Sequence, residues 1–324
     1  MESSTKRKLT EAELSAIARK ALGQGASAAV ELTDGWANAA YLVTLEDGKQ
    51  VIVKAAPPAG TKLMSYERGL MKTEVEVLQL VKKAGNVPVP FVYAYDVSES
   101  LVNCEYFIME KLEGEPYNKV KSSLTEEQQA RIDYQLGVYN RELNEIRGER
   151  FGLYAAAEEV VLSWQETFMN LLLGVLADGE REGVVLPASY ATIRSETAKR
   201  AAALDEITEP RLISWDLWDG NVFIKDGKVS GIIDFERALW GDPLMEHYFS
   251  HFNQSAAFLA GYGLKELSPE QLRRRALYDL YLDLIMCIEC PFRQYEDEAH
   301  LQWAQDNVAQ GWARFLEAAE HVRP

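Results

Sequence analysis

Two aspartates and one asparagine in the middle of the chain have the types and the spacing needed for phosphoryl transfer. Asp216 is followed five residues later by Asn221, and Asp234 comes thirteen residues after that. A phosphoryl group in transfer carries spread negative charge, so catalysis depends on positioning and on cations held at the phosphate oxygens. Mg²⁺ prefers oxygen ligands such as carboxylates and amide carbonyls. The pattern predicts that Asn221 and Asp234 bind Mg²⁺ while Asp216 orients a hydroxyl and accepts its proton.

The residues between Asn221 and Asp234 predict a β-hairpin. They read Val-Phe-Ile-Lys-Asp-Gly-Lys-Val-Ser-Gly-Ile-Ile, two β-rich runs on either side of Asp226-Gly227. Asp-Gly is a typical turn pair because both residues tolerate a positive φ. Such a hairpin would fold Asp234 back beside Asn221. The ordinary alternative is a set of unrelated turn residues, but the joint pattern with Gly241-Asp242-Pro243 favours a single site.

The segment from Ser214 to Pro243 resembles the catalytic and metal-binding loops of the aminoglycoside phosphotransferase and choline-kinase-like family. The pattern of that family is His-x-Asp-x-x-x-x-Asn, then a strand that ends in Ile-Asp-Phe/Trp-Glu, then Gly-Asp-Pro. The chain supplies these residues in order, but Ser214 stands where the family usually has His. Since that His braces the metal-binding segment in kinase-like folds, its replacement bears on the rigidity of the loop more than on the chemistry. The Asp-Leu-Trp-x-Gly-Asn stretch also resembles the fructosamine-kinase branch.

The first third of the chain contains a candidate phosphate-binding lysine. Residues 39–45 and 50–54 predict two strands joined by a turn at Asp47-Gly48, and Lys54 ends the second strand. Lys54 therefore resembles the kinase lysine that contacts the α- and β-phosphates of the nucleotide.

A helix predicted over residues 62–83 carries the acids that could pair with Lys54. Its apolar residues recur at helical spacing, and the family pattern of a Glu before a Val-Leu pair matches Glu74. We expect Glu74 to be the partner, with Glu67 as the alternative. The ordinary role of either acid is a solvent-exposed position on the helix.

Three further contacts with ATP or GTP follow from the resemblance alone. Asn38 ends the segment Asp34–Asn38, which is similar to the nucleotide-positioning loop of the family. The segment Met109–Gly114 resembles the connection between the two lobes, where adenine hydrogen-bonds the main chain. By alignment these contacts fall on the carbonyl of Glu110 and the amide of Leu112. No Gly-x-x-x-x-Gly-Lys-Ser/Thr occurs in the sequence, so a P-loop is excluded.

The expected fold class is α+β: a bilobal protein-kinase-like fold with a small antiparallel-sheet N-terminal lobe and a larger, mainly helical C-terminal lobe. A chain of 324 residues exceeds the ~250–300 at which single cores usually divide. We expect a nucleotide-binding lobe at residues 1–112 and a catalytic and substrate-binding lobe at 113–324. Further strands are predicted at 91–97 and 104–109. Helices are predicted at 125–146, 160–177, 189–204, 245–262, 269–289 and 296–319.

Composition and charge limit the partners. Fifty acidic and 34 basic residues give a net charge of −16, which disfavours nucleic acid and anionic membrane surfaces. The longest apolar stretch, residues 168–177, is shorter than the ~20 residues of a membrane helix. The N-terminus lacks an apolar signal core, and three cysteines do not make a disulfide scaffold. The expected protein is cytoplasmic, and a monomer or weak dimer.

The predicted reaction is the Mg²⁺-assisted phosphorylation of a hydroxyl on a small molecule, with aminoglycosides as the leading class and antibiotic resistance as the implied role. Acids of the C-terminal lobe lie where family members line the substrate cleft and would attract a polycation: Glu289, Glu296, Asp297, Glu298 and Asp306. A solvated acidic face is the ordinary alternative. Other kinase substrates remain open, namely an amino sugar, a ketoamine such as fructosamine, choline or a macrolide. Ser214 also leaves open a nucleotide-binding protein without catalysis.

Two other pairs have the spacing of metal ligands. Cys287 and Cys290 form Cys-x-x-Cys late in a predicted helix, and His247 and His251 would share one helix face. No further ligand is recognisable beside the histidines, and only Cys104 remains to complete a zinc site. We therefore expect buried helical cysteines and histidines with packing or surface roles.

Overall fold

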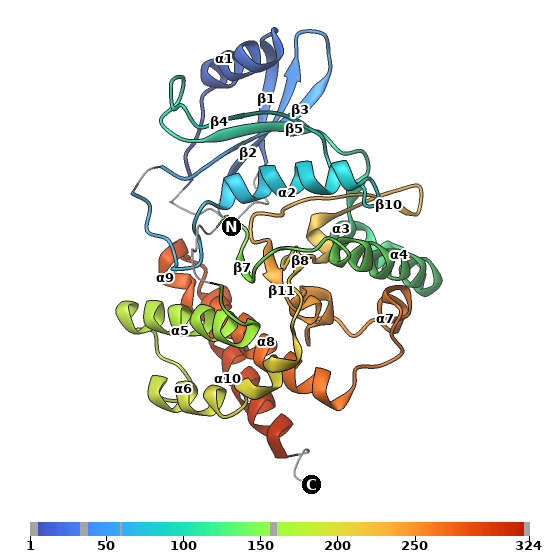
Figure 1. The fold of residues 1–324 in the computed structure, drawn as a ribbon. Coiled ribbons are helices and arrows are strands. Elements are labelled where there is room, and N and C mark those ends of the chain that lie inside the picture. Colours follow the sequence, from blue (N-terminus) through green and yellow to red (C-terminus); the bar gives the residue numbers. More distant parts are fainter. Residues whose placement is uncertain (1–5, 33–37, 59, 156–160, 321–324) are drawn as a thin grey trace.

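Five antiparallel strands in the order β1-β2-β3-β5-β4 form the sheet of the N-terminal lobe (Figure 1). The computed structural model describes residues 6–32, 38–58, 60–155 and 161–320. The predicted hairpin at Asp47-Gly48 and the two later strands are confirmed, whereas β1 was not predicted. The strands are β1 (Ala26–Leu32), β2 (Ala39–Leu45), β3 (Gln50–Ala55), β4 (Val92–Asp96) and β5 (Tyr106–Glu110).

Two helices pack against this sheet from opposite faces. α1 (Glu11–Leu22) begins at a capping box between Thr10 and Glu13 and shares a core with Ile108 of β5. α2 (Leu70–Ala84) packs with the neighbouring Phe107 on the other side. Successive residues of a strand point to opposite faces, so β5 contributes to both cores. The sheet is thus a rigid platform for Lys54 of β3.

The segment before α2 contacts the helical part of the molecule instead of extending the helix. α2 was predicted from residue 62, but it begins at Leu70 because Gly69 has φ +61° and ends the preceding segment. In that segment the main-chain N–H of Ser65 donates to Asp178 Oδ2 at 2.6 Å. Glu67 forms a buried ion pair with Arg293. These contacts compete successfully with helix formation by residues 62–69.

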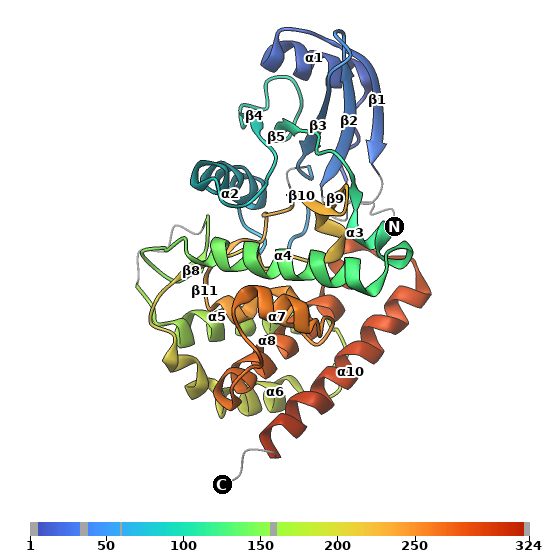
Figure 2. The same ribbon diagram turned by 90° about the vertical axis from the view of Figure 1, so that its right-hand side faces the viewer.

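Helices make up most of the chain after residue 116 (Figures 1 and 2). Capping boxes at Thr125, Ser163 and Ser268 begin three of these helices. Trp164, Phe168 and Tyr281 belong to the core between helices. The helices are α3 (Tyr117–Val120), α4 (Glu126–Asn144), α5 (Trp164–Glu182), α6 (Tyr190–Ala198), α7 (Ala256–Tyr262), α8 (Pro269–Ile288), α9 (Cys290–Arg293) and α10 (Glu298–Glu320).

Two small sheets hold the central loops between the lobes. The predicted hairpin at Asp226-Gly227 is confirmed, with φ of 52° and 73° at its two turn residues. β6 pairs with β9, so the chain joins the helical part soon after Leu112. A boundary between two lobes at residue 112 stays a prediction. The strands are β6 (Glu115–Pro116), β9 (Val222–Lys225) and β10 (Lys228–Ile232) in one sheet, and β7 (Gly152–Leu153), β8 (Arg211–Ile213) and β11 (Leu239–Gly241) in the other.

One predicted helix is largely wrong. Residues 245–262 contain two short 3₁₀ turns, Pro243–Met245 and His247–Phe249, and become α-helical only in α7. His247 and His251 therefore do not share a helix face. Cys287 and Cys290 are buried, unbridged and helical as expected. Across the described ranges, no helix combines the length and the apolar character needed to cross a membrane.

Candidate active site

The loop after β8 holds Asp216 in a fixed main-chain conformation. Trp215 has φ +61°, a left-handed conformation that is rare outside glycine and often found at functional sites. The carbonyl of Asp216 accepts hydrogen bonds from the side-chain amide of Asn221 at 2.9 Å and from the main-chain N–H of Trp218 at 3.0 Å. A hydrogen bond therefore joins the Asp and the Asn of the Asp-x-x-x-x-Asn pattern directly.

A buried carboxylate that the sequence analysis did not identify supports this loop. Glu246 is fully buried and accepts the main-chain N–H groups of Trp215 and Leu217, each at 3.0 Å. Ser214, which replaces the family His, is buried, and its hydroxyl has no hydrogen-bond partner among the described residues. Glu246 thus fixes the main chain on both sides of Asp216. The sequence did contain a signal for this role of Glu246, because it is a single acid among the apolar residues that follow Gly-Asp-Pro.

The β9–β10 hairpin brings Asp234 next to Asn221. The main-chain N–H of Ile233 donates to the carbonyl of Asn221 at 3.0 Å, and Asp234 has φ +69°. One carboxylate oxygen from each of Glu74, Asp234 and Glu236 lies within 4.8 Å of the other two. Three carboxylates at this separation repel one another unless cations neutralise them, and they provide the hard oxygen donors that suit Mg²⁺.

Lys54 joins the sheet to this acidic cluster. Its ammonium lies 2.7 Å from both carboxylate oxygens of Glu74 and 3.4 Å from Asp234 Oδ1. Burial by itself would lower the pKa of Lys54. The negative charges of Asp234 and Glu74 have the larger combined effect, so the pKa of Lys54 is raised. Burial raises the pKa of Glu74 as well, against the attraction of Lys54. Glu67, the alternative partner, pairs with Arg293 instead.

Of the three other predicted nucleotide contacts, Asn38 lies beside this cluster. Asn38 is buried and donates from its side-chain amide to Glu236 Oε2 at 2.6 Å. The rest of its predicted loop, residues 34–37, lies outside the described residues. Glu110 ends β5, and the Leu112 side chain covers Gly231 of β10. Asn38 is therefore close to the carboxylates, whereas Glu110 and Leu112 belong to the connection between the lobes.

Arg237 is the cation that stands beside Asp216. Burial, together with Asp234 and other carboxylates, raises the pKa of Asp216, and the charge of Arg237 opposes this shift. The guanidinium lies over the rings of Tyr66 and Trp215, 5.7 and 6.0 Å from their centroids. Its Nη2 is 3.5 Å from Glu289 Oε2. Arg237 thus partly neutralises the acids around the candidate base.

The five acids predicted to line a substrate cleft fall into different environments. Glu289 is buried between Arg237 and Arg293. Asp297 accepts the main-chain N–H groups of Ala299 and His300 at the start of α10. Asp297 is exposed, as are Glu296, Glu298 and Asp306. These four fit the solvated acidic face that was the alternative to a cleft lining, whereas the buried Glu289 does not.

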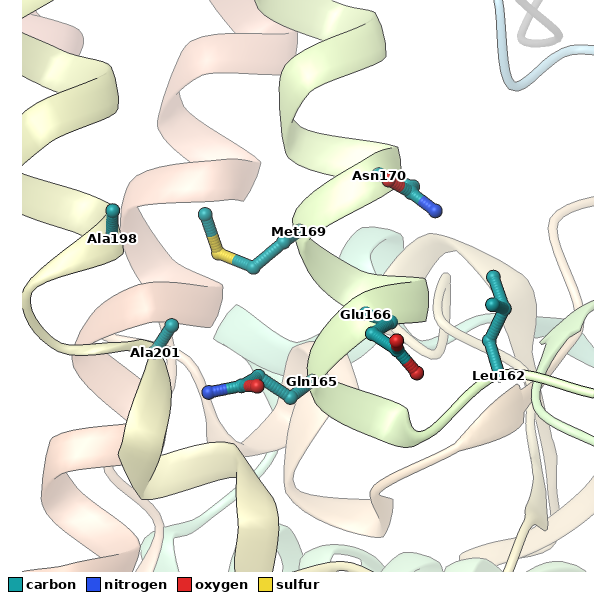
Figure 3. A pocket seen from close by; sticks show the side chains of 7 residues that line it. All are labelled: Leu162, Gln165, Glu166, Met169, Asn170, Ala198 and Ala201. Carbon is teal, nitrogen blue, oxygen red and sulfur yellow. The ribbon is translucent and has the colours of Figure 1, made fainter.

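A cavity of about 390 Å³ lies elsewhere, between α5 and the segment after α6 (Figure 3). Met169 and Gln165 extend from α5 toward Ala198 and Ala201, and none of the residues discussed above lines the space. Glu166 at its edge is occupied by the capping box with Ser163. This cavity therefore has no place in the candidate active site.

Comparison with solved structures identifies the same architecture. The chain is similar to aminoglycoside phosphotransferase APH(4)-Ia, with 15% identity, a TM-score of 0.66 and coverage of 97% of this chain and 100% of that one. It is also similar to APH(2″)-IIa in a ternary complex with streptomycin and ATP, with 17% identity, a TM-score of 0.62 and coverage of 96% and 97%. At these identities the similarity shows the fold, so the protein-kinase-like fold with its N-terminal sheet and helical C-terminal part is confirmed.

Sequence comparison gives a shorter match and a longer one. A subtelomeric hrmA-associated cluster protein of Aspergillus fumigatus is 27% identical over 123 residues, which are 38% of this chain. The match spans 23% of that relative's length, about a quarter. The model of the phosphotransferase enzyme family matches residues 28–278, which is well over half of the chain. The chain therefore belongs to the phosphotransferase enzyme family.

Proposed function

We propose that the protein is a Mg²⁺-dependent small-molecule kinase that transfers the γ-phosphate of ATP or GTP to a hydroxyl of an aminoglycoside-like acceptor. The observation that carries this proposal is the convergence of the central loops on Lys54: its ammonium lies 3.4 Å from Asp234, and Asp234 neighbours Asn221 across the hairpin. Family membership supports phosphotransferase chemistry in general.

The acidic cluster fits a hard divalent cation. Asp234 and Asn221 would hold Mg²⁺, and because the Asn221 amide nitrogen is used in the loop, its carbonyl oxygen is the ligand. When bound, the ion neutralises charge on the phosphate oxygens. Lys54 is held by Glu74 and would contact the α- and β-phosphates. Asn38 and the main chain of Glu110 and Leu112 would position the rest of the nucleotide.

Asp216 would act on the acceptor. Its carboxylate orients the hydroxyl and accepts the proton as the oxygen–phosphorus bond forms and the bond to the leaving oxygen of the nucleoside diphosphate breaks. The hydrogen bonds from Trp215 and Leu217 to Glu246 keep Asp216 in place. A fixed base contributes because the reacting atoms are already aligned.

The acceptor class is supported by two observations. The similar solved structures include complexes with streptomycin, with gentamicin and with hygromycin B. The exposed acids at the start of α10, among them Glu296 and Glu298, could pair with amino groups. A ketoamine, choline or macrolide kinase and a nucleotide-binding protein without turnover are the alternatives.

A nucleotide-consumption assay over a panel of hydroxylated compounds tests the proposal. ADP or GDP release should depend on Mg²⁺ and on one acceptor class, and Asp216→Asn should abolish turnover while sparing nucleotide binding. Asp226→Asn, the same change at an exposed turn, is the matched control and should retain wild-type turnover. Nucleotide binding without turnover of any acceptor would favour the non-catalytic alternative.

A further inference from the structure

Five ring-bearing side chains form a continuous row between the segment after Glu246 and the first turns of α10. We name this row the aromatic ladder: His247, Phe252, Trp303, His300 and Tyr295. The rings of His247 and Phe252 are nearly parallel, with centroids 5.8 Å apart. Phe252 lies 6.4 Å from Trp303, Trp303 lies 5.5 Å from His300, and His300 lies 4.8 Å from Tyr295. Each step is within the range of favourable ring contacts.

The middle of the aromatic ladder is open to solvent. Trp303 is 43% exposed and Phe252 is 40% exposed. Among the described residues, the large exposed aromatic side chains are Phe91, Tyr134, Phe252 and Trp303, so two of these four pack against each other here. Packing alone would favour burying such rings, so two exposed rings in contact with each other are a candidate binding surface.

One end of the aromatic ladder adjoins the catalytic loop. His247 directly follows Glu246, whose carboxylate holds the N–H groups beside Asp216. The next residue, Tyr248, donates its hydroxyl to Asp219, three residues after Asp216. The rings at this end are thus fixed to the same segment that fixes the candidate base.

The other end of the aromatic ladder, at Tyr295, is connected to the surroundings of Asp216 through Cys290 and Glu289. The main-chain N–H of Tyr295 donates to the carbonyl of Cys290 at 3.4 Å, and the preceding Glu289 contacts Arg237 beside Asp216. In Figure 2 the N-terminal end of α10 lies on the side of the helical part that faces the sheet. Both ends of the aromatic ladder are therefore connected, through neighbouring residues, to the groups that surround Asp216.

Phe252 and Trp303 are the two rings of the aromatic ladder whose faces matter for a ligand, because they are the exposed ones. Among the described residues, the cation–π contacts involve other rings, such as Tyr66, Trp215 and Phe292, and none involves Phe252 or Trp303. A ligand can therefore reach these faces without displacing a Lys or Arg. Flat apolar ring faces bind well to exposed Trp and Phe, whereas open-chain polyols lack such a face.

We propose that the aromatic ladder binds a flat ring of the acceptor, so that the substrate class is a hydroxylated compound with an aromatic or otherwise apolar ring face. This inference rests on the proposed kinase function and specifies its acceptor. Trp303 and Phe252 are specificity-determining residues in this proposal, and Asp216 keeps the catalytic role.

Two glycosides with the same hydroxyl groups test the proposal directly. Phenyl β-D-glucopyranoside and methyl β-D-glucopyranoside are titrated into the full chain with Mg²⁺ and a nonhydrolysable nucleotide, with calorimetric detection. The phenyl compound should bind about tenfold more tightly, the size expected for one good ring contact. Trp303→Ala should remove this difference and Trp303→Phe should keep part of it. Tyr134→Ala, which removes an equally exposed ring on α4, should change nothing.

Several results would overturn the proposal. They are equal affinity for the two glycosides, no binding of either at millimolar concentration, or a preference that survives Trp303→Ala. Nucleotide consumption, measured on the same samples, separates this failure from failure of the proposed function. Trp303-dependent binding without consumption with any acceptor contradicts the kinase function alone. Consumption whose acceptor KM is unchanged by Trp303→Ala contradicts the ring site alone.

Discussion

The buried carboxylate of Glu246 accepts a hydrogen bond from the main-chain N–H of Trp215, one residue before Asp216. Glu246→Gln would turn one acceptor into a donor facing a main-chain N–H and leave a buried group unpaired, at a cost of about 1–3 kcal/mol. We expect kcat to fall by about tenfold or more, with the nucleotide KM unchanged. Steady-state kinetics check this against Glu317→Gln, an exposed control on α10. Equal kcat values in the two variants would rule out this role of Glu246.

Glu74→Gln should weaken nucleotide binding. The change removes the charge that holds the Lys54 ammonium at 2.7 Å, so Lys54 is pulled toward Asp234. We expect about a tenfold higher nucleotide KM or dissociation constant, equivalent to ~1.4 kcal/mol. Glu76→Gln is the control, because Glu76 lies two residues along the same helix, is only partly buried and pairs with Lys72 instead of Lys54. The role of Glu74 is wrong if both variants bind nucleotide equally well.

Asp234→Asn should raise the requirement for the divalent cation. Loss of one carboxylate from the cluster with Glu74 and Glu236 weakens the attraction for a hard cation. We expect the Mg²⁺ concentration for half-maximal turnover to rise by at least about tenfold. Mn²⁺ binding measured by electron paramagnetic resonance with nucleotide gives a second readout. Asp226→Asn should behave as wild type, and an unchanged cation requirement in Asp234→Asn would refute the assignment.

The contribution of His247 to the stability of the fold should become unfavourable as the pH drops below 6.5. Burial, helped by Arg275, lowers the pKa of His247 from 6.5 to about 4. Between these values the unfolded chain binds the proton and the folded chain does not, so acid favours unfolding. His247 alone should reduce the free energy of unfolding by about 2 kcal/mol at pH 5 relative to pH 7.5.

Denaturant unfolding of wild type and His247→Gln at both pH values isolates this contribution. Other groups titrate in both proteins, so the informative quantity is the difference between their pH dependences. The variant should lose about 2 kcal/mol less between pH 7.5 and pH 5. Identical pH dependences would show that His247 is protonated equally in the folded and unfolded states.

Local signals in the sequence predicted the elements that carry the site. Asp-Gly turns located both hairpins, and the predicted helix start at residue 125 coincides with the capping box of Thr125. These signals depend on neighbours a few residues apart, so they can be recognised without the fold. The pairing of Lys54 with Glu74 was predicted from the family resemblance, in which a Glu precedes a Val-Leu pair, and in the structure the two side chains are 2.7 Å apart.

Contacts between distant residues account for the errors. The predicted helix over 245–262 has suitable apolar residues, but the Glu246 carboxylate is bound by the main chain of residues 215 and 217 instead of facing solvent from a helix. Glu67 pairs with Arg293, 226 residues away. No pattern within either segment specifies such a partner. Tertiary contacts of this kind override local helix propensity.

The segment between Lys62 and Gly69 gives α2 an attachment on each side of the active site. α2 packs on the sheet, while Ser65 and Glu67 just before it are bound to α5 and α9. Lys54 belongs to β3 of that sheet. A rotation that separates the sheet from the helical part must therefore lengthen the contact between Lys54 and Glu74 or break the ion pair of Glu67 with Arg293. The position of the phosphate-binding ammonium thus depends on the distance between the sheet and the helical part.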